Sequence, residues 1–427
     1  MPTTPSPVGA PQAGVDLLDP DFYRDDPHPA FTWMRANDPV HRDEVNGLWA
    51  VSRHADVLDV ERRSNVFSSQ SGYRSWWAPE ENNIISLDDP AHVRQRRVVS
   101  PRFTPRAVRS HAEWLAATID ELLDAIAAAA GERVDVVESL AAPLPCRLTA
   151  RLIGFDEDRW QQVKGWSERL MRIDQAPRDA QVQADLDAAI FEFAGPLMQL
   201  VAQRSECPAD DLISTWVSSG LDDGDDPDPA AFVGSGFGPD TGYSFVRMIN
   251  ETGLFIAGGA ETTRTVISHG LAVFADHPDQ WDLLERQSDL VPTAVEELLR
   301  WVTPLNNFFR TVTEDSRIGD VGVAAGDRVI LLYPSANRDE AVFGDPFTFD
   351  VTRSPNPHLA FGQGTHFCVG ANLARLELVM LFTELTRRFR PPVALTPPVV
   401  EANIFARAVQ SFPMRFEPRE PVDRGVR

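Results

Sequence analysis

The sequence predicts a mainly α-helical chain with small β-sheets, of the α+β class. Over residues 92–204, apolar residues recur at helical spacing with only brief breaks. A further long helix is expected over 245–275, and it ends before Pro278. Short segments separated by Pro and Gly, which are typical of strands and turns, occur near the start of the chain and after Arg300.

The first predicted elements are a short helix and a hairpin. The helix is expected over 29–36, and strands over 40–43 and 48–53 flank Asn46-Gly47, a dipeptide that favours a tight hairpin turn. Apolar residues at helical spacing then predict a helix over 111–130, just before a glycine.

The second half contains the long helix, which glycines interrupt. Gly258 and Gly259 lie inside it, and each costs about 1 kcal/mol relative to Ala, so a compensating role is expected. Further downstream the pattern predicts three strands, a helix and a final hairpin. The strands are expected at 317–319, 321–323 and 328–332, and the helix at 371–388.

Two segments are predicted to be irregular. Residues 1–15, rich in Pro, Thr, Ser and Ala, are expected to form a disordered leader because they bury too little apolar surface to become ordered. Residues 218–243, rich in Gly, Asp and Pro, are expected to form a long flexible loop, which is either a lid or a solvated insertion.

The charge balance excludes two classes of partner. The 427 residues include 40 basic and 63 acidic ones, a formal net charge of -23. Nucleic acids and anionic membrane surfaces attract clustered Lys and Arg, so neither is an expected partner. The sequence contains no run of about 18 apolar residues, the length that a membrane span needs.

The cysteines indicate the compartment. Cys146, Cys207 and Cys368 are an odd number of thiols spread along a long chain. This usage fits a reducing compartment better than a disulfide-linked secreted protein, so the expected location is the cytoplasm.

The most informative motif surrounds Cys368. A glycine-rich loop over 361–370 delivers this cysteine to the start of the helix expected at 371–388. At a helix N-terminus, the dipole and free N–H groups favour a thiolate. One thiolate with no second Cys or His pair nearby is wrong for tetrahedral zinc but suits one axial bond to haem iron. The alternative is an inert buried cysteine beside a turn.

This motif resembles the haem-binding stretch of the cytochrome P450 family, Phe-x-x-Gly-x-x-x-Cys-x-Gly, through Phe361, Gly364, Cys368 and Gly370. The resemblance extends from about residue 19 onward. It implies the cytochrome P450 fold, with one large haem domain over 16–427, haem b held by Cys368, O2 as co-substrate, and insertion of one oxygen atom into a C–H bond.

Two further family motifs follow the same order as in the family. Glu297 and Arg300 match its Glu-x-x-Arg, and with Arg353 they imply a structural cluster beneath the haem. Glu261 and Thr262, after the two glycines of the long helix, match the oxygen-activation motif and imply catalytic proton relay. Without Cys368, a kinked core helix with ordinary threonines explains the second motif.

The resemblance also implies four ligands of the haem propionates: His92, Arg96, Arg310 and His366. His92 and Arg96 are four residues apart and share one helix face. Cationic and hydrogen-bonding groups of this kind suit two buried carboxylates. Taken singly, each residue is more readily explained as a surface charge.

Electrons are expected from outside the chain, because it has neither a Gly-x-Gly-x-x-Gly dinucleotide motif nor iron–sulfur cysteine spacing. The implied partners are a ferredoxin and its reductase, supplied by NAD(P)H, and the enzyme is expected to be a monomer. Arginines around Cys368 are candidates for the docking surface. They are Arg94, Arg97, Arg102 and Arg375.

The substrate is expected to be hydrophobic, because the candidate pocket residues are largely apolar. They are Trp76, Trp77, Ile85, Met171, Ile256, Ala257, Leu305, Phe308 and Val409. Residues 19–40, 295–308 and 356–370 especially resemble actinobacterial P450s that oxidise the sterol side chain, which implies a steroid or terpenoid.

Two alternatives remain open from the sequence. One is a P450 that tailors a peptide, polyketide or other natural product by hydroxylation, coupling or desaturation. The other is a haem protein that binds a ligand without catalysis; the presence of both Glu261 and Thr262 stands against it.

Overall fold

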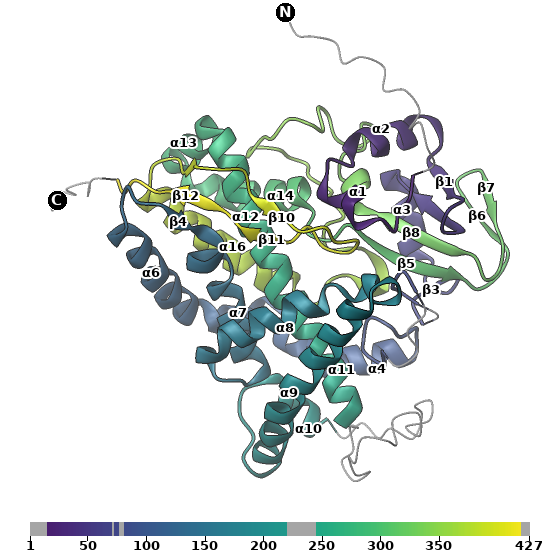
Figure 1. Ribbon diagram of the computed structural model, residues 1–427, viewed down its shortest axis with the longest axis horizontal. Coiled ribbons are helices and arrows are strands. Elements are labelled where there is room, and N and C mark those ends of the chain that lie inside the picture. The colour runs from purple at the N-terminus through teal and green to yellow at the C-terminus, as the bar shows by residue number, and fades with distance from the viewer. Residues whose placement is uncertain (1–14, 71, 77–80, 220–244, 420–427) are drawn as a thin grey trace, which may run out of the picture.

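The computed structural model describes residues 15–70, 72–76, 81–219 and 245–419. Helices make up most of it, and Figure 1 shows them filling one side of the molecule while the largest sheet lies at the other with α2 and α3. The α-helices are α1 (Pro20–Arg24), α2 (His28–Asn37), α3 (His54–Arg62), α4 (Ala91–Val99), α5 (Pro105–Val108), α6 (Ala112–Ala128), α7 (Pro143–Ile153), α8 (Trp160–Leu170), α9 (Ala180–Glu206), α10 (Leu212–Val217), α11 (Phe245–Ile256), α12 (Thr262–Asp276), α13 (Pro278–Arg286), α14 (Val291–Val302), α15 (Tyr333–Ala336) and α16 (Ala371–Arg388).

The strands form small sheets, as expected. The largest has the order β1-β2-β8-β5-β3, in which β2 and β8 run parallel and the other neighbours antiparallel. The strands are β1 (Val40–Asp43), β2 (Leu48–Val51), β3 (Phe67–Ser68), β4 (Val134–Asp135), β5 (Asn307–Val312), β6 (Ser316–Ile318), β7 (Val321–Val323), β8 (Arg328–Leu332), β9 (Val393–Ala394), β10 (Val399–Val400), β11 (Val409–Ser411) and β12 (Pro413–Arg415). The predicted fold class, mainly α with small sheets, is therefore confirmed.

The N-terminal hairpin joins β1 to β2, and its turn spans residues 44–47. Gly47 has φ +67°, a left-handed conformation that favours glycine. The buried Asp43 side chain accepts a hydrogen bond from Leu17 N at 3.0 Å, which ties the chain start to the sheet. Val15, which the prediction places in the leader, is buried in the core cluster that contains Leu17 and apolar residues of β2 and β8.

The long predicted helix is observed as α11, a π-helical turn and α12, which follow one another through the middle of the molecule (Figure 1). The π-turn, Ala257–Glu261, contains both glycines. A Cβ atom on Gly259 would lie 2.7 Å from Thr149 Oγ1 of α7, so this glycine permits close helix packing. Nothing lies within 4 Å of the same position on Gly258, which faces open space.

The remaining predicted segments fall partly outside the described residues. Residues 1–14 of the expected leader and nearly all of the expected loop 218–243 lie there; Ser218 caps the end of α10. Among the helices of the described residues, none combines the length and apolar character needed to cross a membrane.

Candidate active site

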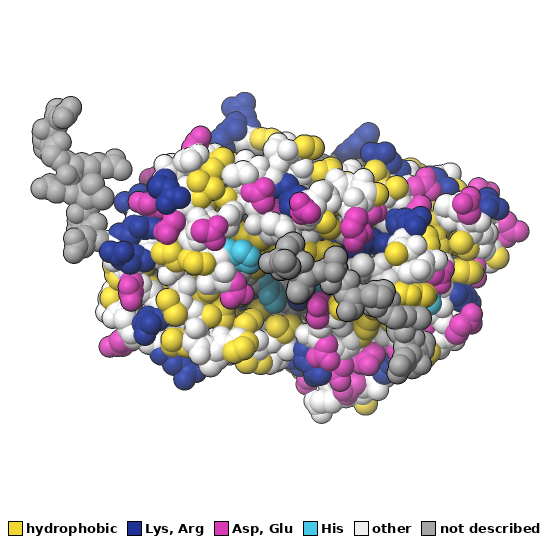
Figure 2. Space-filling model, turned by 90° about the horizontal axis from the view of Figure 1, so that it is seen from above, with side chains coloured by type: hydrophobic (Ala, Val, Ile, Leu, Met, Phe, Trp, Pro, Cys, Tyr) yellow, Lys and Arg dark blue, Asp and Glu magenta, His cyan; other side chains and the backbone are white. Residues whose placement is uncertain are grey.

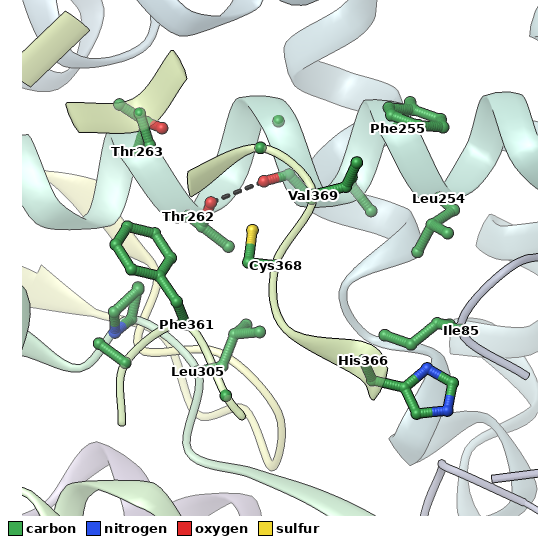
Figure 3. A pocket seen from close by; sticks show the side chains of 18 of the residues that line it. Ile85, Leu254, Phe255, Thr262, Thr263, Leu305, Phe361, His366, Cys368 and Val369 are labelled. Carbon is green, nitrogen blue, oxygen red and sulfur yellow. Dashed lines mark hydrogen bonds between the residues drawn. The ribbon is translucent and has the colours of Figure 1, made fainter. Parts of the chain in front are cut away.

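A large cavity lies where α11, α12, β5 and the loop before α16 meet. About 1740 Å³ of space lies between its walls, counting the open solvent at its mouth. Thr262 of α12 and Cys368 of the loop both line it, together with Phe361, His366 and other labelled side chains (Figure 3). Most of the wall is apolar, so the cavity suits a hydrophobic ligand.

The loop that carries Cys368 is fixed at both ends. Cys368 N donates to Phe361 O at 2.9 Å, and Gly370 caps the start of α16. A Cβ atom on Gly370 would lie 3.9 Å from Cys368 Sγ. Burial raises the pKa of the Cys368 thiol, and the amides of Gly370 and Ala371 with nearby arginines only partly offset it.

Two opposing effects act on the Cys368 thiol. The helix N-terminus does act on Cys368 as expected, but desolvation outweighs it in the protein alone. A metal ion bound to this sulfur would deprotonate the thiol outright.

The four predicted cationic groups are brought together at one edge of the cavity. Arg96, Arg310 and His366 line it, and the His92 ring lies 4.4 Å from that of His366 between centroids. His92 Nε2 and His366 Nε2 are buried and have no hydrogen-bond partner. Burial, followed by the charges of Arg310, His92 and Arg96, lowers the pKa of His366 to about 2. This corner therefore has two buried imidazole nitrogens without a hydrogen-bond partner among the described residues.

Thr262 and Glu261 take different directions although they are neighbours. Thr262 lines the cavity, and its hydroxyl donates to Gly258 O at 2.6 Å (Figure 3). The carboxylate of Glu261 is not part of the cavity wall; it is buried, 2.6 Å from Arg264 Nη2. Arg264 in turn lies 2.6 Å from Glu168 of α8.

This placement separates the two residues of the predicted proton relay. Adjacent residues of a helix point about 100° apart, so the helix directs one of the pair to the cavity and the other into the protein. The Glu261 side chain acts through Arg264 on the packing of α12 against α8, and it does not contact the space in which substrate binds.

The predicted pocket residues divide into two groups. Five line the cavity: Ile85, Met171, Ala257, Leu305 and Phe308. Three others do not. Trp76 instead donates from Nε1 to Ile173 O at 3.2 Å, while Ile256 and Val409 are fully buried in the core. Trp77 lies outside the described residues. The prediction was therefore wrong for Trp76, Ile256 and Val409, because burial alone does not distinguish cavity walls from core.

Two buried carboxyl groups in the wall were missed by the sequence interpretation. Glu61 of α3 accepts hydrogen bonds from the Tyr333 hydroxyl and Gln363 N and lies 3.5 Å from Arg310 Nη2. Glu377 of α16 is 2% exposed, and its Oε1 has no hydrogen-bond partner. Glu377 occupies the helix that follows the cysteine motif, and its acidic character amid apolar neighbours is the signal that would have found it.

Glu297, Arg300 and Arg353 meet below the cavity. Arg300 donates to Glu297 through Nε and Nη2, both at 2.7 Å, and both side chains are fully buried. Arg353 Nε lies 3.2 Å from the same carboxylate. Arg300 Nη1 also donates at 2.9 Å to two backbone carbonyls of the 337–346 segment. The cluster joins α14 to the segment that leads to Cys368.

Comparison with known proteins identifies the family. A family model described as Cytochrome P450 matches residues 239–406. A relative named Steroid C26-monooxygenase, from Mycobacterium tuberculosis, is 38% identical over 417 residues, 96% of this chain and 98% of the relative. The chain belongs to the cytochrome P450 family. Linalool 8-monooxygenase of Pseudomonas putida is 34% identical over 396 residues, covering 88% of this P450 and 92% of the relative.

Solved structures agree with this identification. Mycobacterium marinum cytochrome P450 CYP268A2 in complex with pseudoionone superimposes with a TM-score of 0.84 and 31% sequence identity, over 95% of this chain and 99% of that chain. The protein is thus a P450 monooxygenase, which uses haem b, O2 and NAD(P)H-derived electrons delivered by redox partners, and acts on hydrophobic substrates. When bound, haem supplies the binding and reductive activation of O2.

The residues of this P450 fit haem. Cys368 offers one sulfur to the cavity, and the described residues contain no group of three or more His, Cys, Asp or Glu side chains that could hold a competing metal ion. His92 Nε2 and His366 Nε2 are buried without hydrogen-bond partners in the part of the chain that the structure describes, and with the nearby cations Arg96 and Arg310 they suit the two carboxylates of haem b.

Glu297→Gln is expected to lower the free energy of unfolding by about 3 to 5 kcal/mol, because it leaves the Arg300 charge buried without its carboxylate. Urea unfolding of the haem-loaded P450 measures this. Glu121→Gln is the control: Glu121 pairs with Arg147 at 3.0 Å but is exposed, and its loss should cost about 1 kcal/mol or less. Equal losses in the two variants would contradict the structural role of Glu297.

Glu377 makes stability depend on pH. Burial raises its pKa from 4.5 to about 8, so the folded P450 keeps a proton that the unfolded chain has lost. The stability that the protonated Glu377 side chain contributes is complete below the pKa of this group in the unfolded chain, and it falls as the pH rises toward about 8. Glu377→Gln cannot lose this proton. The stability of the wild type relative to the variant should therefore fall by about 3 kcal/mol between about pH 6 and pH 8, measured by urea unfolding. If the stabilities of the wild type and Glu377→Gln change equally with pH, Glu377 does not titrate in this way.

Proposed function

We propose that this P450 inserts one oxygen atom of O2 into a C–H bond of a steroid or a related terpenoid, with electrons from a ferredoxin. The apolar cavity that contains both Cys368 and Thr262 carries this proposal. The relatives add support, since one is named for the C26 position of steroids and another for linalool, a terpenoid alcohol.

We assign the haem contacts within this proposal. Cys368 provides the axial ligand of the iron, while Phe361 and Gly370 shape its loop. Arg96 and Arg310 pair with the propionates, and His92 and His366 donate to them through the ring nitrogens that otherwise lack partners. The burial of these donors beside the cavity supports the assignment.

We assign proton delivery to Thr262. Its hydroxyl lies on the cavity wall and is oriented by the carbonyl of Gly258, and open space lies beside that glycine. A hydroxyl held in this way passes a proton between water and a reacting oxygen. Glu261 is a positioning residue, because its carboxylate reaches Arg264 and not the cavity.

The proposed substrate class can be tested by comparing a steroid that has a side chain with one that lacks it. Carbon 26 is the terminal methyl carbon of the sterol side chain, so cholesterol contains it and testosterone lacks it. A steroid side-chain hydroxylase should give a saturable change in haem absorption with cholesterol, at least about tenfold tighter than with testosterone, and then a terminally hydroxylated product. Tight binding of linalool alone would favour a terpenoid substrate, and binding of none would end the proposal.

A wall variant localises the binding site. Leu305→Trp fills the cavity and should weaken binding of the best ligand by about tenfold or more, without loss of haem. Val399→Trp is the control, because Val399 is 51% exposed on β10 and lies outside the cavity wall. If the two variants bind equally, the ligand occupies another site.

We further propose that ferredoxin docks on the arginines around Cys368. Arg94 and Arg97 are exposed on α4, which supports their role. Arg102 lies 2.8 Å from Asp210, and Arg375 pairs with Glu296, so these two are already engaged in ion pairs. Arg97→Glu should slow reduction by ferredoxin at low salt, and the difference should shrink as salt rises. We also propose that the enzyme is a monomer and that it is located in the cytoplasm. Analytical sedimentation tests the oligomeric state.

A further inference from the structure

A second cavity lies apart from the haem site, between the start of α2 and the ends of α12 and α14. About 650 Å³ of space lies between its walls, open solvent included. Its polar lining residues are His28, His269, Arg338 and Arg407, and Trp301 and Phe347 add aromatic walls. Figure 2 looks onto the α2 side of the molecule and shows histidine side chains in a hollow there.

The charge of this second cavity is positive. Arg338 is 3% exposed, and its guanidinium carbon lies 4.4 Å from the ring centre of Trp301. Arg338 donates only to backbone carbonyls, the nearer being Trp301 O at 2.8 Å. No carboxylate in the part of the chain that the structure describes forms an ion pair with Arg338 or Arg407. Burial lowers the pKa of Arg407, whereas the carboxylate of the exposed Asp26 acts on Arg407 over a longer distance, and its charge favours the protonated form by raising the pKa.

Two buried nitrogens of the second cavity have no partner. Arg407 Nε and His28 Nδ1 are both buried and unbonded, and no residue within 15–70, 72–76, 81–219 or 245–419 accepts a hydrogen bond from the Arg407 side chain. By contrast, His269 Nε2 is occupied, because it donates to Arg407 O at 2.9 Å. Buried polar groups are normally satisfied, so this cavity lacks an acceptor.

The electrostatics agree with the missing acceptor. Burial and then the charges of Arg338 and Arg407 lower the pKa of His28 well below its usual value. Burial and Arg407 lower the pKa of His269 to about 3. The two histidines are therefore neutral, and the two arginines repel one another.

The chain start does not supply a carboxylate to this cavity. Residues 1–14, which precede the segment leading to α2, contain neither Asp nor Glu. The acidic segment 220–244 is joined to α10 and α11, which lie at the opposite side of the molecule from α2 (Figure 1). An anion from solution is the simplest partner for Arg338 and Arg407.

We propose that the second cavity binds a small organic anion. Its carboxylate or phosphate group pairs with Arg407 and Arg338 and accepts from His28, and its apolar part lies against Trp301 and Phe347. Guanidinium groups suit both oxyanions because their N–H donors form a planar fork. The site is distinct from the substrate cavity, although Arg407 N donates to Pro304 O, and Pro304 lines that first cavity.

The test uses calorimetric titration of the haem-loaded full chain with sodium benzoate and, separately, with inorganic phosphate, at constant ionic strength in chloride. The wild type is expected to bind at least one of them at a single saturable site. Binding of phosphate alone would identify a phosphate ligand, whereas binding of benzoate alone would identify an aromatic or apolar carboxylate. Both results support the site.

Variants locate that binding. Arg407→Gln should weaken it by about tenfold or more, and Arg407→Lys, which keeps the charge but not the fork, should weaken it less. Arg286→Gln, at an exposed arginine of α13, is the matched control and should bind like the wild type. His28→Ala provides an independent variant should Arg407→Gln fail to fold, with an expected loss of about threefold or more.

Three results would overturn the proposal. The first is the absence of saturable binding of either anion to the wild type. The second is undiminished binding by Arg407→Gln and His28→Ala. The third is a benzoate-dependent change in haem absorption with the same dissociation constant as the heat signal, which would place the anion in the first cavity.

Discussion

Cys368→Ala is expected to abolish the absorption band of the reduced, carbon monoxide-bound protein that is characteristic of thiolate-ligated haem. Cys368 is the cysteine that lines the cavity, and its loop is fixed by the Phe361 carbonyl and the start of α16. Alanine offers no sulfur to the iron, so the effect should be complete. The measurement is a reduced, carbon monoxide difference spectrum of purified protein.

The other two cysteines are the controls for this result. Cys207 is exposed at the end of α9, and Cys146 is buried in α7, where burial strongly raises the pKa of its thiol. Cys207→Ala and Cys146→Ala should both keep the band. A band that persists in Cys368→Ala would mean that another residue ligates the iron, and the site assignment would then be wrong.

Thr262→Ala is expected to keep substrate binding and reduction by NAD(P)H, while roughly a tenfold or larger share of the electrons ends in hydrogen peroxide instead of product. The variant removes the hydroxyl that Gly258 O orients on the cavity wall. Without this group, protons are no longer delivered in the position that leads to product. Parallel measurement of NAD(P)H consumed, product formed and hydrogen peroxide released gives the coupling.

Two variants separate this role from a packing effect. Thr262→Ser retains a hydroxyl and should restore most of the coupling. Thr383→Ala removes a hydroxyl that donates at 2.6 Å to a backbone carbonyl of α16, the same bond in a helix position outside the cavity wall. It should leave coupling unchanged. Unaltered coupling in Thr262→Ala would make Thr262 an ordinary core threonine.

Much of the fold is predictable from local signals. The helix expected over 371–388 is observed with the same bounds, because Gly370 caps its start and its apolar spacing continues to the end. The long helix interrupted by glycines is also observed, and so is the hairpin from Val40 to Val51. These elements depend on residues close in sequence, and periodicity and turn chemistry describe such residues well.

The candidate site was predicted in part through the resemblance. The residues matched to the propionate contacts come from α4, β5 and the cysteine loop, and the structure places them at one edge of one cavity. No periodicity or spacing brings His92 next to His366, which lies far along the chain. Their neighbouring rings follow from how α4 packs against the loop.

Side-chain direction and surroundings required the tertiary structure. Sequence paired Glu261 with Thr262, but the turn of the helix sends their side chains to different environments. Nothing in the sequence distinguishes Glu377 or Arg407, and their significance comes from buried polar atoms that have no hydrogen-bond partner in the described residues. The sequence by itself determined the family, the cysteine motif and most helices. Which charges are buried, paired or left without an acceptor was decided only by packing, because desolvation depends on neighbours that are distant along the chain.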